Sequence, residues 1–516
     1  MKLSWFEKTA YAMGDAAANL VWRGALAYLA VFYTDTFGLT TSAAALLFLV
    51  VRLSDGVTDI LMGMIADRTQ TRWGKFRPWI FVSTPFLGLF MVLCFTTPDL
   101  TPQGKLIYAY VTYIGLTLAY TFNNVPYSAL MGVMTDSDQE RTSLSGFRFA
   151  GAFIGGLFVM GFLPKMVSYF GQGDDITGYQ TSIYIFAGLL VSLMVITVVG
   201  TKERVSQVHQ VAIPFKQEAK DLAKQLPFIM APLLGISMFF YYRTWSTFFI
   251  LLVLMCITAI AIKRLLSVTE ASRSRSQQDI IDLITNKPWL ILLGMGFLTM
   301  MFNGVKYGVI AYYFKYYIGD EMLAGQYFIG LLVVSVFGAL CTDKLVAKWG
   351  RKHVFIIALL ASSVFTSALF WVDASNVSMI FVLGCTAEFF AAIMPTLFFS
   401  MLGDSADYSE WKTGRRATGL VFSAGTFVQK TGGGFAGALV LVVLASYGYN
   451  GMDAQTSEAA LPGILLLMSF IPSAFAVLGA ILMSFYPISD NQQKEMTETL
   501  IQRRAQQQRN IADTPA

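Results

Sequence analysis

The sequence has little charge and almost no histidine. Asp, Glu, Lys and Arg make up only 13% of its 516 residues, and the two histidines are His209 and His353. Lone histidines beside basic loops are usually solvated surface residues. The chain also lacks the H-E-x-x-H, G-x-S-x-G and G-x-x-x-x-G-K patterns that build zinc, serine-nucleophile and phosphate sites. These absences argue against an enzyme.

Cysteine is equally sparse and shows no pairing pattern. Cys94, Cys256, Cys341 and Cys385 all lie in apolar runs without paired spacing. Such cysteines are expected to pack as small apolar residues, which argues against disulfides and metal clusters, and no cofactor is expected. The N-terminal stretch lacks the charged region, apolar core and cleavage site of a signal peptide, so we expect the first apolar run to be retained.

What the chain has in excess is apolar sequence. Apolar residues make up 55% of the chain, a proportion typical of a multi-pass membrane protein. Runs long enough to cross a bilayer as helices recur in both halves. They lie at about 11–36, 41–66, 79–98, 106–134, 144–164 and 181–200, and again at about 289–318, 321–342, 353–372, 377–402, 417–446 and 461–486.

The basic residues indicate which loops face the cytoplasm. The net charge of +5 reflects Lys and Arg in alternate loops, a distribution that reports topology and not nucleic-acid binding. By the positive-inside rule both termini are cytoplasmic. We therefore predict an all-α membrane protein, divided into a six-helix bundle at 1–200, a cytoplasmic linker at 201–287, a second six-helix bundle at 288–486 and a cytoplasmic tail at 487–516.

The linker contains an apolar insertion. Residues 228–262 are apolar except near Arg243, and basic residues flank both ends. A run of this length allows two crossings of about 17 residues each, at the short end of the spanning range. We expect an extra two-helix membrane hairpin that starts and ends in the cytoplasm, and its side chains indicate no function.

The two halves repeat one another. Each carries a cation one turn before a G-x-x-x-G pair: Arg148, Gly151 and Gly155 in the fifth run, and Lys430, Gly433 and Gly437 in the eleventh. The glycines favour close helix packing. The cations are not explained by packing, and transporters built from repeats place their site where the halves meet. Two such halves favour alternating access over a passive channel.

A charged stripe marks the second apolar run. Arg52, Asp55 and Asp59 fall within roughly 60° of one another on a helix, so they share one face. Each would cost about 2.5–3.5 kcal/mol near the bilayer centre, and Arg52 offsets only one of the two acids. A structural ion pair beside a protonated Asp is one interpretation. A cation or proton site is the other, and we favour it because ionisable residues inside spans are usually functional.

The same stretch carries a family resemblance. The pattern R-x-x-D-x-x-x-D, the following D-R-x-x-x-R-W-G-K-F-R-P-W and the segment 406–430 resemble the glycoside-pentoside-hexuronide:cation symporters, relatives of the bacterial melibiose carrier in the major facilitator superfamily. The resemblance covers most of the chain apart from the insertion. It implies a major facilitator fold and a monomeric symporter of the bacterial inner membrane that carries a sugar or glycoside inward with Na⁺ or H⁺.

Candidate cation ligands come from two runs. Asp55 and Asp59 offer the hard oxygen ligands that Na⁺ prefers, and they are the expected metal ligands if sodium is the coupling ion. The resemblance implies that the hydroxyls of Thr58 and Thr121 add to them. Where the melibiose carrier has a further carboxylate, this chain has Asn124, so coupling to H⁺ stays open.

Candidate sugar ligands are amides, a guanidinium and aromatic rings. Sugars are held by bidentate hydrogen bonds and by rings stacked on their C–H faces. The residues that fit are Asn19, Trp22, Tyr120, Asn124 and Arg148, with Lys430 as a charge partner at the site. The two aromatic side chains fit packing roles as well.

The substrate itself is left open at this point. By the resemblance, the positions matching Asn19 and Ser128 are Asp and Trp in the melibiose carrier, so we expect a substrate other than melibiose. Acidic, sulfonated and neutral glycosides all fit. A cation-coupled transporter of a lipid or another non-sugar solute is the alternative function, and it would need a lateral apolar cleft where we expect a polar pocket.

Further charges are expected to act in pairs. Lys306 and Glu388 lie in the seventh and tenth runs and could pair for structure or for function. Charges after the fourth and tenth runs are expected to form a salt-bridge network that closes the cytoplasmic side. They are Asp136, Arg141, Asp404, Arg415 and Arg416.

Overall fold

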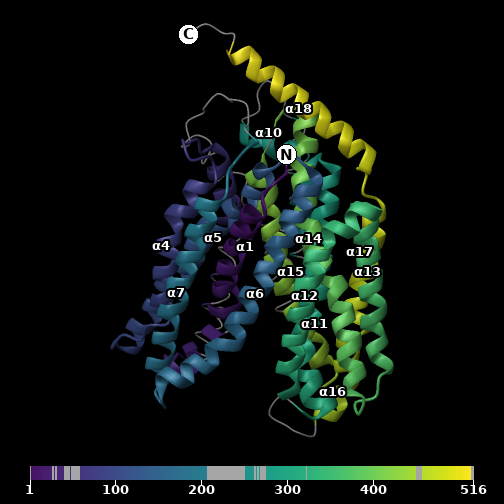
Figure 1. The fold of residues 1–516 in the computed structure, drawn as a ribbon. Coiled ribbons are helices and arrows are strands. Elements are labelled where there is room, and N and C mark those ends of the chain that lie inside the picture. The colour runs from purple at the N-terminus through teal and green to yellow at the C-terminus, as the bar shows by residue number, and fades with distance from the viewer. Residues whose placement is uncertain are drawn as a thin grey trace.

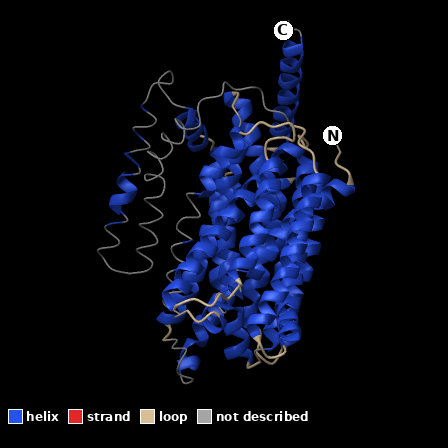
Figure 2. Ribbon diagram, turned by 90° about the vertical axis from the view of Figure 1, so that its left-hand side faces the viewer, coloured by secondary structure: helices blue, strands red, loops and turns tan. Residues whose placement is uncertain are grey.

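The computed structural model describes most of both halves of the chain. It describes residues 2–25, 28–29, 32–39, 47, 51, 58–205, 250, 252–257, 259–260, 263, 267, 275–320, 322–415, 417–448 and 456–512. Within these ranges the regular structure is helical, apart from one isolated bridge between Thr71 and Gly74 (Figure 2). This confirms the predicted all-α fold class.

The first half forms one bundle of helices (Figure 1). Its elements are α1 (Trp5–Asn19), continued by η1 (Leu20–Ala25), then η2 (Phe32–Thr36), a helical segment at 58–68, α4 (Arg77–Cys94), α5 (Pro102–Met134), α6 (Asp138–Gly171) and α7 (Asp175–Gly200). Side chains cap several of these helices: Ser137 accepts a hydrogen bond from the backbone of Glu140, and Thr101 caps α5 just before a proline at its first position. Such residues start helices because they satisfy free backbone N–H groups.

The second half forms the other bundle. Its elements are α11 (Lys287–Tyr312), continued by η4 (Tyr313–Ile318), then α12 (Met322–Trp349), α13 (Arg351–Ala368), η5 (Leu369–Trp371), α14 (Val377–Thr413), α15 (Thr418–Ser446), α16 (Thr456–Met468) and α17 (Phe470–Ser484). A short helix α10 (Arg275–Ile284) precedes this bundle, and α18 (Asp490–Ala512) follows it. Both lie at the end of the molecule that also holds the N-terminus (Figure 1).

Several helices have the length and composition of membrane spans. Among the described residues there are nine helices of this kind. Of the predicted hairpin at 228–262, only 250, 252–257 and 259–260 are described, and these are helical. The rest of the hairpin lies outside the described residues, as do Asp55 and Arg416, so the hairpin stays a prediction.

The two bundles meet along a few helices. Helix α6 packs against α12 and α14, and α5 packs against α15. Two buried hydroxyl groups of α6 bond to α14 across this interface: that of Thr142 shares a hydrogen bond of 2.9 Å with Ser400, and that of Ser145 donates to the carbonyl of Thr396 at 2.6 Å. In the repeat, α5 matches α14 and α6 matches α15. The α6–α14 contact and the α5–α15 contact are therefore equivalent in the two halves.

The glycines of the repeat behave differently in the two halves. A Cβ at Gly151 would lie 2.3 Å from the carbonyl oxygen of Ala12, and one at Gly155 would lie 2.4 Å from that of Ala16. These two glycines therefore let α6 approach α1, as predicted. A Cβ at Gly433 or at Gly437 would meet nothing within 4 Å among the described residues, so close packing does not explain the second pair.

This difference gives a matched test of stability. We expect Gly151→Ala to lower the free energy of unfolding by about 1–3 kcal/mol, because the added methyl must displace backbone. Gly437→Ala is the control, and it is expected to be neutral or stabilising because alanine is the better helix former. Thermal unfolding midpoints of the two detergent-solubilised variants would check this, and equal midpoints would contradict the tight contact.

Candidate functional site

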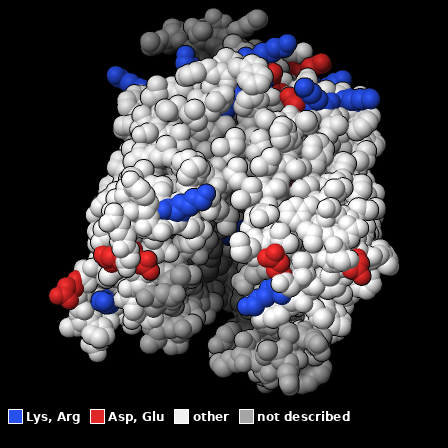
Figure 3. Space-filling model, turned by 60° about the horizontal axis from the view of Figure 1, so that its bottom comes forward, with Lys and Arg blue, Asp and Glu red and all other residues white. Residues whose placement is uncertain are grey.

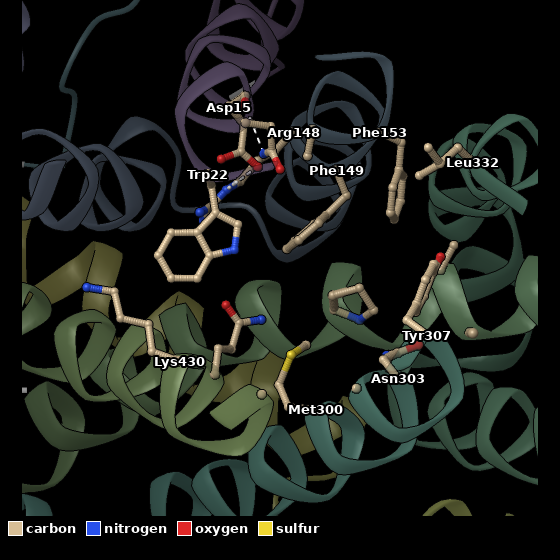
Figure 4. Close-up of a pocket in the computed structure, with 18 of the residues that line it drawn as sticks. Asp15, Trp22, Arg148, Phe149, Phe153, Met300, Asn303, Tyr307, Leu332 and Lys430 are labelled. Atoms are coloured by element: carbon tan, nitrogen blue, oxygen red, sulfur yellow. Dashed lines mark hydrogen bonds and ion pairs between the residues drawn. The ribbon is translucent and has the colours of Figure 1, made fainter. Parts of the chain in front are cut away.

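A cavity of about 560 Å³ lies between the two bundles (Figure 4). The N-terminal half lines it from α1, η1, α5 and α6, and the C-terminal half from α11, α12, α14 and α15. All six predicted substrate residues line it: Asn19, Trp22, Tyr120, Asn124, Arg148 and Lys430. The sequence analysis therefore identified a set of side chains that the fold brings to one place.

The two cations of the repeat meet in this cavity. Arg148 on α6 and Lys430 on α15 both line it, although they come from opposite halves. Figure 4 shows them projecting from opposite sides of the cavity, with Trp22 between them in this view. Both cations of the repeat therefore lie at one cavity, and their part in substrate binding stays a prediction.

Arg148 is held by partners that orient its guanidinium. Its Nε lies 3.3 Å from a carboxylate oxygen of Asp15, and its Nη2 donates to the hydroxyl of Ser128 at 3.0 Å. The Cζ atom lies 4.1 Å from the centroid of the Phe399 ring. Nη1 is buried and has no hydrogen-bond partner among the described residues. Nη1 is thus the nitrogen of this fork that no described residue binds.

Asp15 is the site residue that the sequence analysis missed. The predicted site residues on the helix at this corner of the site are Asn19, where the resemblance implies an Asp in the melibiose carrier, and Trp22. Asp15, one turn earlier on the same helix, lines the cavity and binds Arg148. Asn19 donates its amide to the carbonyl oxygen of Asp15 at 2.9 Å. The corner therefore contains an acid, an amide and a guanidinium.

Asn124 adds a second amide from α5. Its side chain is only 6% exposed, and its Oδ1 atom is buried without a hydrogen-bond partner among the described residues. A buried acceptor of this kind costs free energy unless something donates to it. Since Asn124 lines the cavity, a ligand hydroxyl can supply that donor.

Asp59 forms a buried cluster next to the cavity. Its Oδ1 accepts hydrogen bonds from the Thr121 hydroxyl and the Lys430 ammonium, each at 2.9 Å. Lys430 Nζ also lies 2.9 Å from Oδ2, and the Asp59 side chain is fully buried. Thr58 precedes Asp59 on the same helical segment and is half-buried. Of the four predicted cation ligands, the structure brings Asp59 and Thr121 into direct contact, while Asp55 lies outside the described residues.

The aromatic pair packs together at the wall. The rings of Trp22 and Tyr120 are stacked, with centroids 5.5 Å apart. The ammonium of Lys430 lies 5.8 Å from the Tyr120 centroid. Each ring thus has one face against its neighbour, and both residues still line the cavity. Trp22 and Tyr120 therefore pack against each other and also form part of the cavity wall.

The predicted ion pair of the second half is present. Lys306 Nζ lies 2.6 Å from Glu388 Oε2, and both side chains are almost fully buried. The other oxygen of Glu388 accepts hydrogen bonds from the hydroxyls of Tyr307 at 2.9 Å and Ser335 at 3.0 Å. Glu388 and Tyr307 line the same cavity as Arg148.

Ion pairs close one end of the interface. Arg141 on α6 is fully buried and lies 2.8 Å from carboxylate oxygens of both Asp404 and Asp407 on α14. Arg351 of α13 also binds Asp404 and lies 3.2 Å from Asp138 at the start of α6. This network joins the halves at the end that holds α10 and α18. At the other end, a hollow separates the halves on the face shown in Figure 3.

The other residues of the predicted network lie nearby. Arg415 binds Asp282 of α10 through two nitrogens, at 2.8 and 3.0 Å, so this pair ties α14 and α15 to the segment before α11. Asp136 lies half-buried in the turn between α5 and α6. Arg351 was not among the predicted residues. It follows a basic loop in the sequence, and such a position indicates which side of the membrane the loop faces but not that the side chain pairs with Asp404.

The charged cavity between two repeated helical bundles, together with the comparisons with known proteins, defines a transporter of the major facilitator fold and not an enzyme. The family model described as "MFS/sugar transport protein" matches residues 10–244 and 222–490. The chain belongs to this family, which confirms its resemblance to the glycoside-pentoside-hexuronide:cation symporters.

Individual relatives match along almost the whole chain. The "Putative glycoside/cation symporter YagG" of Escherichia coli (strain K12) is 32% identical, over 99% of this chain and 98% of the relative. The "Inner membrane symporter YicJ" of the same organism is 31% identical, over 98% and 97%. A solved structure of the proton:xylose symporter XylE shares the fold, with a TM-score of 0.56 and 15% identity over 96% of this chain and 97% of that one.

Proposed function

We propose that the protein is a secondary active symporter that moves a sugar or glycoside into the cell together with Na⁺ or H⁺. The names of its relatives, a glycoside/cation symporter and an inner membrane symporter, support this function and a place in the bacterial inner membrane. Both termini would then lie in the cytoplasm, at the end that Arg141 and Asp404 close. The structure would represent a state open to the outside.

One observation carries the coupling: Lys430 takes part in both proposed sites. It lines the cavity and it also pairs with Asp59. A cation that binds Asp59 competes with Lys430 for the same oxygen atoms, so binding would release the ammonium toward the cavity. Two ligands that act on one side chain change each other's affinity, which is the physical requirement for coupling.

The cavity has the chemistry that a sugar requires. Asp15 and Asn124 offer acceptors, while Arg148 and Asn19 offer donors, and the Trp22 ring lies beside them. Hydroxyl groups of a sugar can satisfy the unpartnered atoms of Arg148 and Asn124. A lipid would instead require a continuous apolar wall, which these polar residues interrupt.

Transport would require the protein to alternate between a state closed at the cytoplasmic end and a state closed at the opposite end. The network of Arg141, Arg351, Asp404 and Asp138 closes the cytoplasmic end in the present state. Opening inward requires these pairs to separate while the hollow on the opposite side closes. Buried ion pairs are suited to this task because they favour one defined arrangement and dissociate as a unit.

Uptake into membrane vesicles tests the proposal. We expect a labelled glycoside to accumulate above its external concentration only when a Na⁺ or an H⁺ gradient is imposed, and the effective gradient identifies the ion. Vesicles without the protein are the control. Accumulation that needs neither gradient, or a failure of every sugar in the panel while a lysolipid is transported, would refute the proposed function.

A further inference from the structure

The cavity has a second polar end that the proposed sugar contacts do not use. Glu388, Tyr307 and Asn303 line it from α14 and α11 of the C-terminal half. In Figure 4, Asn303 and Tyr307 lie across the cavity from Asp15 and Arg148. The two groups of polar residues therefore face one another from different halves of the protein.

Apolar side chains line the space between these two groups. Phe149, Phe153 and Leu332 lie on one side and Met300 on the other (Figure 4). A wall of this kind suits the C–H faces of sugar rings, while the polar groups suit their hydroxyls. A ligand with a single ring that binds Arg148 leaves the polar group around Glu388 and Tyr307 to water. A ligand with two linked rings can bind both polar groups.

Glu388 is built to accept a hydrogen bond from a ligand. A carboxylate offers about four acceptor sites, and three donors reach it among the described residues. Tyr307 and Ser335 donate to one oxygen, and Lys306 lies against the other. One site on the oxygen facing Lys306 is left for a hydroxyl of a ligand in the cavity.

The charges around the cavity balance in pairs. Within the described residues, Arg148 pairs with Asp15, Lys430 with Asp59, and Lys306 with Glu388. At the two proposed ring positions, an anionic ligand would have to displace Asp15 from Arg148 or Glu388 from Lys306, which is costly in a low-dielectric site, whereas a neutral ligand leaves both pairs intact. Because Asp15 pairs with Arg148, the structure favours neutral glycosides among the acidic, sulfonated and neutral candidates that the sequence left open.

We infer that the transported solute is a neutral glycoside of two rings, with one ring held at Asp15 and Arg148 and the other at Glu388 and Tyr307. This inference rests on the proposed function and narrows it. Glu388 is then a specificity-determining residue, because it recognises the second ring. Lys306 is a positioning residue that orients the Glu388 carboxylate.

A competition experiment in vesicles measures this specificity. The panel contains xylobiose, cellobiose, lactose and melibiose, the monosaccharides xylose, glucose and galactose, and methyl β-glucuronide, each tested for uptake and against the best substrate. We expect a neutral disaccharide to bind at least tenfold more tightly than its component monosaccharides and than the glucuronide. If a monosaccharide or the glucuronide competes equally well, the inference is wrong although symport stands. If no sugar accumulates, the proposed function itself fails.

Variants separate recognition from structural support. The double variant Glu388→Gln/Lys306→Gln removes both charges together, so no buried charge is left alone. We expect it to bring the ratio of disaccharide to monosaccharide affinity close to one, while monosaccharide affinity stays within twofold of wild type. Tyr307→Phe, which removes one cavity hydroxyl and keeps the ring, is expected to lower disaccharide affinity alone by about threefold to tenfold.

Three results with these variants would contradict the assignment of the second ring to Glu388 and Tyr307. A ratio that is unchanged in a transport-competent double variant would make the ion pair purely structural. If the double variant fails to fold, Tyr307→Phe decides alone, and an unchanged ratio in it overturns the second-ring assignment. Equal losses for disaccharides and monosaccharides in Tyr307→Phe would overturn it too.

Discussion

Replacing Asp59 by asparagine is expected to abolish gradient-driven accumulation while the protein still exchanges sugar down its concentration gradient. The Asp59 carboxylate is fully buried between Thr121 and Lys430. Asparagine keeps the shape but removes the charge that binds either the cation or Lys430. Hydrogen bonds to charged groups contribute about 1.5–3 kcal/mol each, so a neutral amide at these two contacts predicts a fall of about 100-fold in coupled accumulation.

The measurement compares two assays on the same vesicles. Uptake under an imposed Na⁺ or H⁺ gradient reports coupling, and exchange of labelled for unlabelled sugar reports binding and movement without it. Thr117→Ala is a matched control on α5, because the Thr117 hydroxyl bonds only to carbonyls of its own helix among the described residues. An Asp59→Asn protein that accumulates sugar as wild type does would contradict the coupling role.

Substituting Arg148 by lysine should weaken sugar binding by about 10-fold to 100-fold, although the positive charge is kept. Arg148 uses two nitrogens to bind Asp15 and Ser128, and a third remains for a ligand. A lysine ammonium is a point charge that cannot reproduce this planar fork. It would also leave the Asp15 carboxylate less firmly oriented toward the cavity.

The dependence of uptake on sugar concentration distinguishes this effect from general damage. We expect the apparent KM to rise and the maximal rate of exchange to change little. Ser128→Ala serves as a graded control, since it removes one hydrogen bond to Arg148 and leaves the guanidinium in place, so a smaller loss of affinity is expected. An unchanged KM in Arg148→Lys would show that the guanidinium does not contact the sugar.

Helix positions could be predicted from the sequence because apolar runs and basic loops are governed by local physics. The predicted runs at 377–402 and 417–446 correspond to α14 (Val377–Thr413) and α15 (Thr418–Ser446). The ends agree less well than the centres. Residues 403–413 continue α14 beyond the apolar run, where Asp404 and Asp407 are covered by Arg141 and not by lipid. Arg141 belongs to α6 in the other half, so the local sequence around 403–413 does not show that the helix continues there.

The candidate site was recognised through charges that repeat, and Asp15 was missed because its partner is distant. Asp15 stands alone among small residues of the first run, and Arg148 follows it 133 positions later. One signal could have identified it: Asp15 and Asn19 are four residues apart, so they share a helix face. The cations Arg148 and Lys430 were identified because the two halves carry them at matching positions.

The ion pairs around the cavity also bear on how the chain is made. Each joins residues that leave the ribosome at different times, separated by 133 positions for Asp15 and Arg148, 82 for Lys306 and Glu388, and 371 for Asp59 and Lys430. Until synthesis of the later helix is complete, the earlier charge sits in the bilayer without its partner. The separation is largest for Asp59, so Lys430, its ion-pair partner among the described residues, reaches the N-terminal half only late in translation.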